Sequence, residues 1–387
     1  PAKGALLQLK DGTVGSDPAV NSSKGLGISR VYMLNPQRLA PMYDYSTNIP
    51  SQEDLDTHTG LVVYNVNKCF NWRGEDEGVY VWTGSEWQSL SQPKISSPDV
   101  GYYEDSRPQV LGSQTYPYSK FGRAGTWMTE NFRYLPNDNS ITASAGAGAG
   151  DYTSRFYAYP NGDAATVDVA PSTWQPRQGL LYTFPAVTAG KQDVNLNQKQ
   201  RPTTTSSTPG GNEVEMDKML DGPDSNGYYY VQGICPDGWH VPSDREWNRL
   251  EQEIYENAIE YSSYTTSELS DLSIWDPISA LDSWNPSWNV DESFRGSTGS
   301  GGHNMAMMAP CKAPIPEGTF PYLNGKSLPI SQGGFNVLPI GAAVQGMFDG
   351  YNWNSFFWTS SVALKKTLTE IDEAAYTRLL YSESARV

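Results

Sequence analysis

The sequence predicts an α+β protein, because short strands bounded by turn residues surround one well-marked helix. The helix signal lies in residues 233–254, which read GICPDGWHVPSDREWNRLEQEI. Ser243 is the predicted N-cap, and Glu246 three residues later completes a capping box. Three apolar residues then recur on one helical face, namely Trp247, Leu250 and Ile254. The segment therefore predicts a strand, a turn and a helix that ends near Ala258 and buries its apolar stripe.

A small all-β module is predicted at residues 1–92, ahead of the α+β domain. Short apolar runs bounded by Gly, Ser, Asn and Pro are typical of strands. They occupy residues 5–10, 27–34, 60–66, 79–82 and 87–90, and a polar connection is expected at 35–58. The last two strands are predicted to form a tight hairpin. Residues 93–112 have the Pro and Ser content of a linker, so residues 113–387 are taken as the second domain.

The second domain is predicted to contain several further strands and two long polar insertions. Alternating or short apolar runs predict strands. They lie at residues 155–159, 179–184, 333–341, 356–361 and 375–381. The insertions at 137–152 and 190–227 are rich in Gly, Ala, Ser, Thr or Pro, and such long loops are functional or mobile.

Composition and charge exclude several functions. The 387 residues carry a net charge of −16, and no basic stripe is present to replace phosphate counterions, which argues against nucleic acid. No apolar run approaches the roughly 18 residues of a membrane span. An acidic chain that begins at Pro1 fits an extracellular, outer-surface protein that is processed after export.

Three cysteines, Cys69, Cys235 and Cys311, are too few for a disulfide scaffold. A bond between Cys235 and Cys311 is one alternative, and an odd count leaves at least one cysteine without a partner in the chain. Spacing alone does not choose between these alternatives.

The sequence predicts no catalytic centre. The three histidines are scattered, and no metalloprotease, nucleophile-elbow or phosphate-loop motif occurs. A lone His240 beside a capped helix is expected to be structural. The nearest cluster of calcium-type oxygen ligands is Asp221, Asp224 and Asn226, where the ligand count favours a structural calcium, or none, over a sugar-binding one.

Aromatic side chains are the remaining candidates for ligand binding, because exposed Trp and Tyr stack on sugars or dock protein partners. Four are singled out, namely Trp284, Trp288, Tyr351 and Trp353. The run 351–354 after Asp349-Gly350 is predicted to be an exposed aromatic loop. Any one tryptophan is nevertheless more often a core residue.

Five motifs in order resemble the FISUMP domain, the Fibrobacter succinogenes major paralogous domain. They lie at residues 127–134, 179–184, 235–247, 334–341 and 358–361. The family's C-P-x-G-W-H signature matches 235–247 almost letter for letter. The resemblance implies a structural role for seven of its residues, namely Cys235, Trp239, His240, Pro242, Ser243, Glu246 and Trp247.

The same signature is similar to a segment of formylglycine-generating enzymes, which share the C-type lectin-like architecture. That likeness implies one or two helices packed against short antiparallel sheets. It also raises the alternative of an oxidase with copper bound by a cysteine pair. Family members continue into a closing strand that ends in Val-Arg-Cys, and this chain lacks it, so an unpaired sheet edge or a strand supplied by another chain is expected.

The first 90 residues resemble a stalk or connector module of Bacteroidetes surface proteins. Together the two resemblances imply a non-catalytic adhesin, or a subunit of a surface fibre such as a fimbria. Its expected partners are proteins or glycans on a surface, or other copies of the chain. The alternative is a carbohydrate-binding module that supports polysaccharide use.

Overall fold

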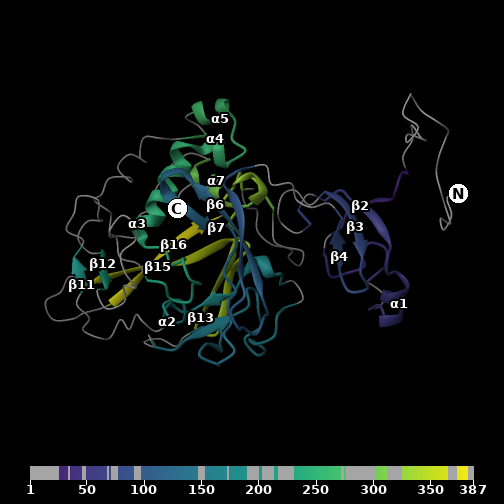
Figure 1. Ribbon diagram of the computed structural model, residues 1–387, viewed down its shortest axis with the longest axis horizontal. Coiled ribbons are helices and arrows are strands. Elements are labelled where there is room, and N and C mark those ends of the chain that lie inside the picture. Colours follow the sequence, from purple (N-terminus) through teal and green to yellow (C-terminus); the bar gives the residue numbers. More distant parts are fainter. Residues whose placement is uncertain are drawn as a thin grey trace. The chain divides into compact units, whose positions relative to one another are not determined.

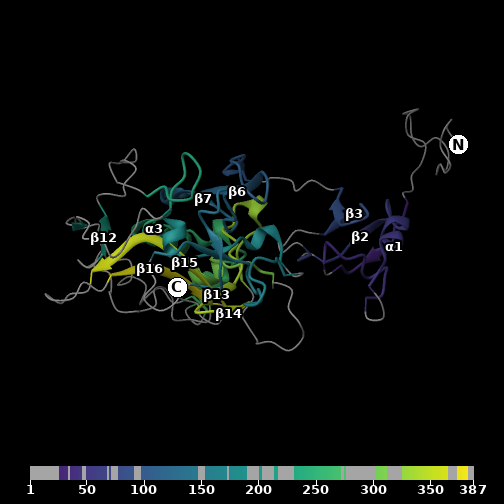
Figure 2. The ribbon, with the colours of Figure 1, turned by 90° about the horizontal axis from the view of Figure 1, so that it is seen from below.

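The computed structural model has a mixed α+β architecture with several small sheets and few helices (Figures 1 and 2). All structural statements concern the residues that the structure describes. These are residues 26–33, 35–45, 49–67, 69–70, 77–90, 97–146, 153–171, 174–189, 200–202, 213–216, 231–271, 274–275, 301–311, 325–364 and 373–381.

The chain divides into two compact units. The first comprises residues 1–71 and 76–92, and the second comprises residues 72–75 and 93–387. The expected linker at 93–112 is wrong in part, because Val100–Asp105 forms strand β5 and pairs with β6 inside the second unit. The prolines of the segment 93–112 lie outside strand β5, so the Pro and Ser content of the whole segment concealed the strand within it.

The first unit is a four-stranded sheet in the order β1-β2-β3-β4. The strands are β1 (Arg30–Val31), β2 (Val62–Asn65), β3 (Gly78–Trp82) and β4 (Trp87–Ser89). Alternate residues of β3 are buried, as expected for a sheet with one face on a core. That core contains Met33, Leu39, Val63, Phe70, Tyr80, Trp82 and Trp87. The strands predicted at 60–66, 79–82 and 87–90 are confirmed, and β1 pairs with β2 in parallel.

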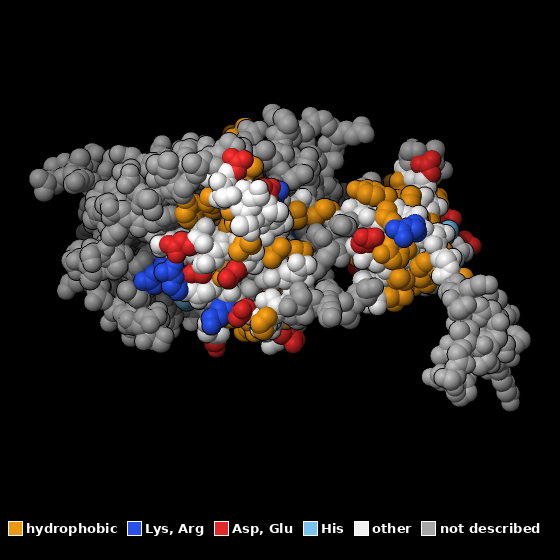
Figure 3. All heavy atoms as spheres, turned by 90° about the horizontal axis from the view of Figure 1, so that it is seen from above, with side chains coloured by type: hydrophobic (Ala, Val, Ile, Leu, Met, Phe, Trp, Pro, Cys, Tyr) orange, Lys and Arg blue, Asp and Glu red, His pale blue; other side chains and the backbone are white. Residues whose placement is uncertain are grey.

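The first unit has a helix and exposed apolar side chains in addition to its sheet. Helix α1 (Gln52–Thr57) lies within the connection and is capped by Ser51, whose side chain accepts from the backbone of Asp54. Apolar side chains also gather on the surface of this unit (Figure 3). Those more than half exposed are Leu26, Tyr32, Ile49 and Leu90.

The second unit holds three sheets (Figure 1). The first has the order β5-β6-β7, with β6 at Gln114–Phe121 and β7 at Gly125–Met128. The second has the order β10-β9-β8, with β8 at Thr142–Ala143, β9 at Phe156–Ala158 and β10 at Leu181–Tyr182. The third is six-stranded, and its strands are β11 (Gln200–Pro202), β12 (Glu213–Met216), β13 (Ile340–Val344), β14 (Met347–Tyr351), β15 (Asn354–Leu364) and β16 (Glu373–Tyr381).

Helices of the second unit gather beside the sheets, while β15 and β16 run together as a long antiparallel pair (Figures 1 and 2). The α-helices are α2 (Phe184–Val187), α3 (Asp244–Glu256), α4 (Ala258–Tyr261), α5 (Thr266–Ser270) and α7 (His303–Met307). Single 3₁₀ turns are η1 (Gly122–Ala124), η2 (Pro176–Gln178) and η4 (Ile330–Gln332). The strands predicted at 356–361 and 375–381 are thus confirmed, whereas most of 333–341 precedes β13.

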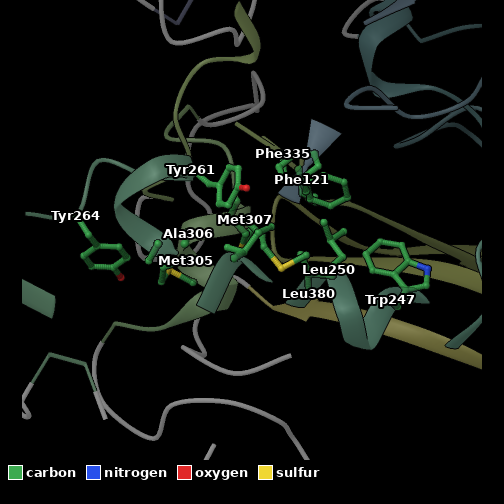
Figure 4. Packing of buried hydrophobic residues seen from close by; sticks show 14 of the residues in the cluster. Phe121, Trp247, Leu250, Tyr261, Tyr264, Met305, Ala306, Met307, Phe335 and Leu380 are labelled. Atoms are coloured by element: carbon green, nitrogen blue, oxygen red, sulfur yellow. The ribbon is translucent and has the colours of Figure 1, made fainter. Parts of the chain in front are cut away.

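Helix α3 carries the core of the second unit. Its stripe of Trp247, Leu250 and Ile254 is buried as predicted, and it packs with Phe121 before η1 and Leu380 from β16 (Figure 4). The methionines of α7 close the other side of the cluster. By area, each large apolar side chain buried here contributes about 1.5–3 kcal/mol.

Helix α3 also buries a charged cluster on the side next to α7 and β16. Glu251 is fully buried, and its carboxylate lies 3.1 Å from Arg378 Nη1 and 3.4 Å from His303 Nε2. The three residues come from three different elements. Charges removed from water are tolerated only when they are paired, so this cluster fixes how α3, α7 and β16 meet.

An aromatic cavity at the family signature

A cavity of about 480 Å³ lies where β7, the start of α3 and the segment before β13 come together. Ligand sites typically have volumes of about 300–1,000 Å³ and are mainly apolar with a few polar groups. Six aromatic rings line this one, namely Trp127, Phe132, Trp239, Trp247, Phe335 and Phe357. The cavity is therefore a candidate binding site. Six of the residues in its wall belong to the signature motif expected to be structural, namely Cys235, Trp239, His240, Pro242, Glu246 and Trp247.

One wall is the edge of a sheet. Every residue from 123 to 132 lines the cavity, and this run contains the whole of β7. β7 pairs with β6 on one side only. Gly122, just before the run, has a φ of +34°, a conformation that other residues rarely adopt, so glycine is favoured at the start of η1.

The opposite wall begins with the N-terminus of α3. Ser243 Oγ accepts from Glu246 N at 3.2 Å, and Ser243 N donates to Glu246 Oε2 at 2.7 Å, which confirms the predicted capping box. The other carboxylate oxygen of Glu246 lies 2.8 Å from His240 Nε2. Burial alone would raise the pKa of Glu246, but the hydrogen bonds from His240 and Ser243 outweigh it and lower that pKa.

The two signature tryptophans lie against opposite faces of the β5-β6-β7 sheet. Trp239 packs on Tyr118, with ring centroids 5.8 Å apart, and Tyr118 pairs with Met128 of β7. Trp247 packs on Trp127 at 5.1 Å. Since Met128 and Trp127 are neighbours in a strand, their side chains point to opposite faces. The signature therefore contacts both faces of this sheet.

Buried polar atoms in the cavity wall lack hydrogen-bond partners. They are the indole Nε1 of Trp247 and both amide atoms of Asn336. Both residues are at least 97% buried, being 3% and 2% exposed. In Figure 4 the indole nitrogen of Trp247 lies at the end away from Leu250. An unmade buried hydrogen bond costs about 1–3 kcal/mol, so these atoms mark a place where a ligand or water would be favoured.

Cys235 is held in the wall by Arg107. The guanidinium donates to the carbonyl of Ile234 at 3.0 Å, pairs with the buried Asp105 at 2.7 Å, and lies 3.9 Å from the ring centre of Tyr134. Burial raises the pKa of the Cys235 thiol to about 12, although Arg107 opposes the shift. A thiol in this state is a poor nucleophile and a poor metal ligand.

The Cys235 thiol is expected to resist alkylation in the folded chain. At pH 8 a pKa near 12 leaves about a thousandfold less thiolate than the ordinary pKa of 9.0, so iodoacetamide should react correspondingly slowly. Raising the pH should speed the reaction, because more thiolate forms. Intact mass after unfolding without reductant should then show a single added group. Rapid single labelling of the native chain at pH 8 would contradict the buried thiol.

The cysteine pairing differs from the alternative drawn from the sequence. Cys235 is a free thiol, whereas Cys69 and Cys311 are disulfide-bonded. A Cys235–Cys311 bond is therefore wrong. Cys235 lies instead in the cavity wall, where Arg107 donates hydrogen bonds to the carbonyl groups of Ile234 and Cys235.

The candidate ligand residues of the sequence do not meet in one site. Trp284 and Trp288 lie outside the described residues, as do Asp221, Asp224 and Asn226. The prediction of an exposed aromatic loop is wrong. Tyr351 accepts a hydrogen bond from Gln178 Nε2, and the ring of Trp353 packs on that of Tyr381 with centroids 5.3 Å apart. Burial also raises the pKa of Tyr351 to about 12. Between Tyr351 and Trp353, Asn352 is buried and adopts a φ of +66° at the turn from β14 to β15.

The described part of the chain contains no candidate metal site. No group of three His, Cys, Asp or Glu residues there could hold an ion. Likewise, none of the described helices is long and apolar enough to cross a membrane.

Sequence reasoning missed the walls of the cavity that lie far from the signature. Trp127, Phe335 and Asn336 fall in family motifs, but spacing along the chain does not show that they meet Trp247. The alternation of Thr126 and Trp127 is compatible with a strand that has one polar and one apolar face. It does not indicate that this strand lies at the edge of a sheet.

Comparison with known families matches the cavity-forming part of the chain. The family model of the Fibrobacter succinogenes major domain matches residues 122–384, which is more than half of the 387 residues. No curated protein and no solved structure matches the chain. The chain belongs to the Fibrobacter succinogenes major domain family.

Proposed function

We propose that this chain is a non-catalytic, surface-associated binding protein that acts in adhesion or as a subunit of a surface fibre. Membership of the family suggests surface association. The observation that carries the proposal is the aromatic cavity, which combines six rings with buried polar atoms that lack partners. Such a site gains free energy by enclosing a ligand.

The chemistry of the cavity supports binding rather than reaction. His240 is engaged with Glu246, and Glu246 in turn caps α3, so neither is poised against a nucleophile. Cys235 has a pKa of about 12 through burial. A copper oxidase would need two cysteine thiolates, and Cys311 is already disulfide-bonded, so the cysteines do not fit a copper site.

The proposal includes a C-type lectin-like architecture for the second unit and an extracellular location on the outer cell surface. Small sheets beside a few short helices are compatible with that architecture. A carbohydrate-binding module is the competing function. It loses support from Tyr351 and Trp353, whose rings are packed.

Adhesion through the cavity is tested with a substitution that obstructs the cavity. Thr126 is exposed and lines the cavity, so Thr126→Arg should obstruct it without disturbing the core. Beads coated with the full chain are applied to gelatin, to fibronectin and to a glycan array, with and without EDTA. Thr126→Arg is expected to lower retention about tenfold or more on whichever surface holds the wild type, since the ligand loses its buried contacts.

Val110→Arg is the matched control, because Val110 is 63% exposed and does not line the cavity. It adds the same charge and should leave retention unchanged. Equal retention of the wild type and Thr126→Arg would refute adhesion through this site. Retention only on glycans, lost with EDTA, would favour the carbohydrate-binding function and a calcium site.

A further inference from the structure

The outer edge of β7 has free backbone hydrogen-bonding groups. The bond from Thr129 N to Pro117 O, 2.9 Å long, fixes which residues of this strand face β6. Hydrogen-bonded pairs alternate along an antiparallel ladder. Trp127 and Gly125 therefore bond with β6, opposite Ser119 and Phe121, and Thr126 and Met128 turn their N–H and C=O groups away from it.

These outward groups face the cavity rather than a neighbouring strand. β7 is the last strand in the order β5-β6-β7, and among the described residues no partner is found for the backbone of Thr126 or Met128. The same residues line the cavity. A strand edge of this kind is a template for pairing with another chain.

The side walls of the cavity suit the side chains of an added strand. Such a strand would lie about 4.8 Å from β7, with successive side chains on opposite faces of the sheet. On the face of Trp127 they would meet Trp247, Phe335 and Phe357. On the other face they would meet Trp239, which rests on Tyr118.

The hydrogen-bonding groups in the cavity favour a peptide over a sugar. Charged side chains in the wall already have protein partners, as in the pairs Arg123–Glu253 and His240–Glu246. Trp127 and Trp247 meet edge to face, with ring planes at 64°, so they do not form one flat stacking platform. The groups left over are mainly those of a strand edge, and their natural complement is another strand.

We infer that the cavity binds an extended peptide segment of a partner protein, which adds to the β5-β6-β7 sheet beside β7 and places an apolar side chain at every second position. This inference rests on the proposed function, because it names the ligand of the same site. Trp247 Nε1 and the amide of Asn336 then supply hydrogen bonds near the buried side chains of the peptide.

The test uses a phage-displayed library of linear twelve-residue peptides selected on the full chain. Selected peptides are expected to alternate apolar and polar residues. Synthetic copies carrying an N-methyl group at an amide that faces β7 should bind about tenfold or more weakly, because the hydrogen bond is lost and the methyl group clashes. N-methylation at the next amide should leave binding unchanged.

The protein side is tested with Thr126→Pro, which removes an outward N–H that the sheet does not use. Proline is tolerated on such an edge. Thr126→Val keeps the N–H and serves as the matched control. Peptide binding should fall about tenfold or more with Thr126→Pro and by far less with Thr126→Val, which retains the backbone donor. Circular dichroism checks the fold of both, and the N-methylated peptides give an independent answer if Thr126→Pro unfolds.

Three outcomes would overturn the inference: a selection that returns no binding peptide, binding that is indifferent to N-methylation, or binding that survives Thr126→Pro. If peptides fail while Thr126→Arg still abolishes retention on a glycan surface, the proposed binding function stands and its ligand is a sugar. If Thr126→Arg also has no effect, both proposals fail.

Discussion

Replacing Glu251 by Gln is expected to lower the free energy of unfolding of the second unit by about 3–5 kcal/mol. The carboxylate is fully buried and lies 3.1 Å from Arg378 Nη1. Removing its charge takes away an ionic partner of the buried Arg378 guanidinium, and the weaker compensation of that desolvated charge is the source of the loss. Urea unfolding followed by near-ultraviolet circular dichroism measures it.

Glu256→Gln provides the matched control on the same helix. Glu256 pairs with Arg123 at the surface, where their side chains are 41% and 71% exposed, so its loss should cost less than about 1 kcal/mol. Replacing Glu251 by Leu together with Arg378 by Met should restore much of the lost stability, because both charges of this buried pair are then removed. A loss below about 1 kcal/mol for Glu251→Gln would show that the cluster is hydrated in solution.

Replacing Trp247 by Ala is expected to lower the free energy of unfolding by a similar 3–5 kcal/mol. The indole packs on Trp127 and Phe357, both with centroids 5.1 Å away, and truncation would leave a void that these rings cannot fill. The same variant should enlarge the cavity and abolish ligand binding. Calorimetry and the bead-retention measurement report the two effects.

Trp247→Phe separates ring packing from the indole N–H. A phenyl ring keeps most of the packing and removes a buried donor that has no protein partner, so the cost should stay below about 1.5 kcal/mol. A cost equal to that of Trp247→Ala would mean that Nε1 makes a bond in solution, for example to water inside the cavity.

Local features of the second unit were predictable because they depend on neighbours in sequence. The capping box of Ser243 and Glu246 and the stripe of α3 follow from spacings of three, four and seven residues. Short apolar runs likewise predicted strands β2 and β3 of the first unit and strands β15 and β16 of the second unit. The family was recognisable from motif order, and the match over residues 122–384 confirms it.

What could not be predicted depends on residues far apart in the chain. Glu251 is one turn beyond Trp247, and a glutamate in a helix is normally expected to be solvent-exposed. Its burial is compensated by Arg378 and His303, which are far away in the sequence. The cavity needs β7 to meet residues 335–338, and no periodic pattern encodes that meeting. The prediction of an exposed loop at 351–354 was wrong for the same reason, because Gln178 contacts Tyr351 and Tyr381 contacts Trp353.

The position of β16 in the core has a consequence for the order in which the domain forms. Leu380 shares a cluster with Phe121, and Arg378 neutralises Glu251, so contacts made early in the sequence await one of its last strands. Contacts between residues so distant in the chain slow folding. During synthesis the segment with α3 is complete long before its partner strand emerges. Until β16 is available, the apolar stripe of α3 and the carboxylate of Glu251 lack these contacts, which exposes the chain to aggregation.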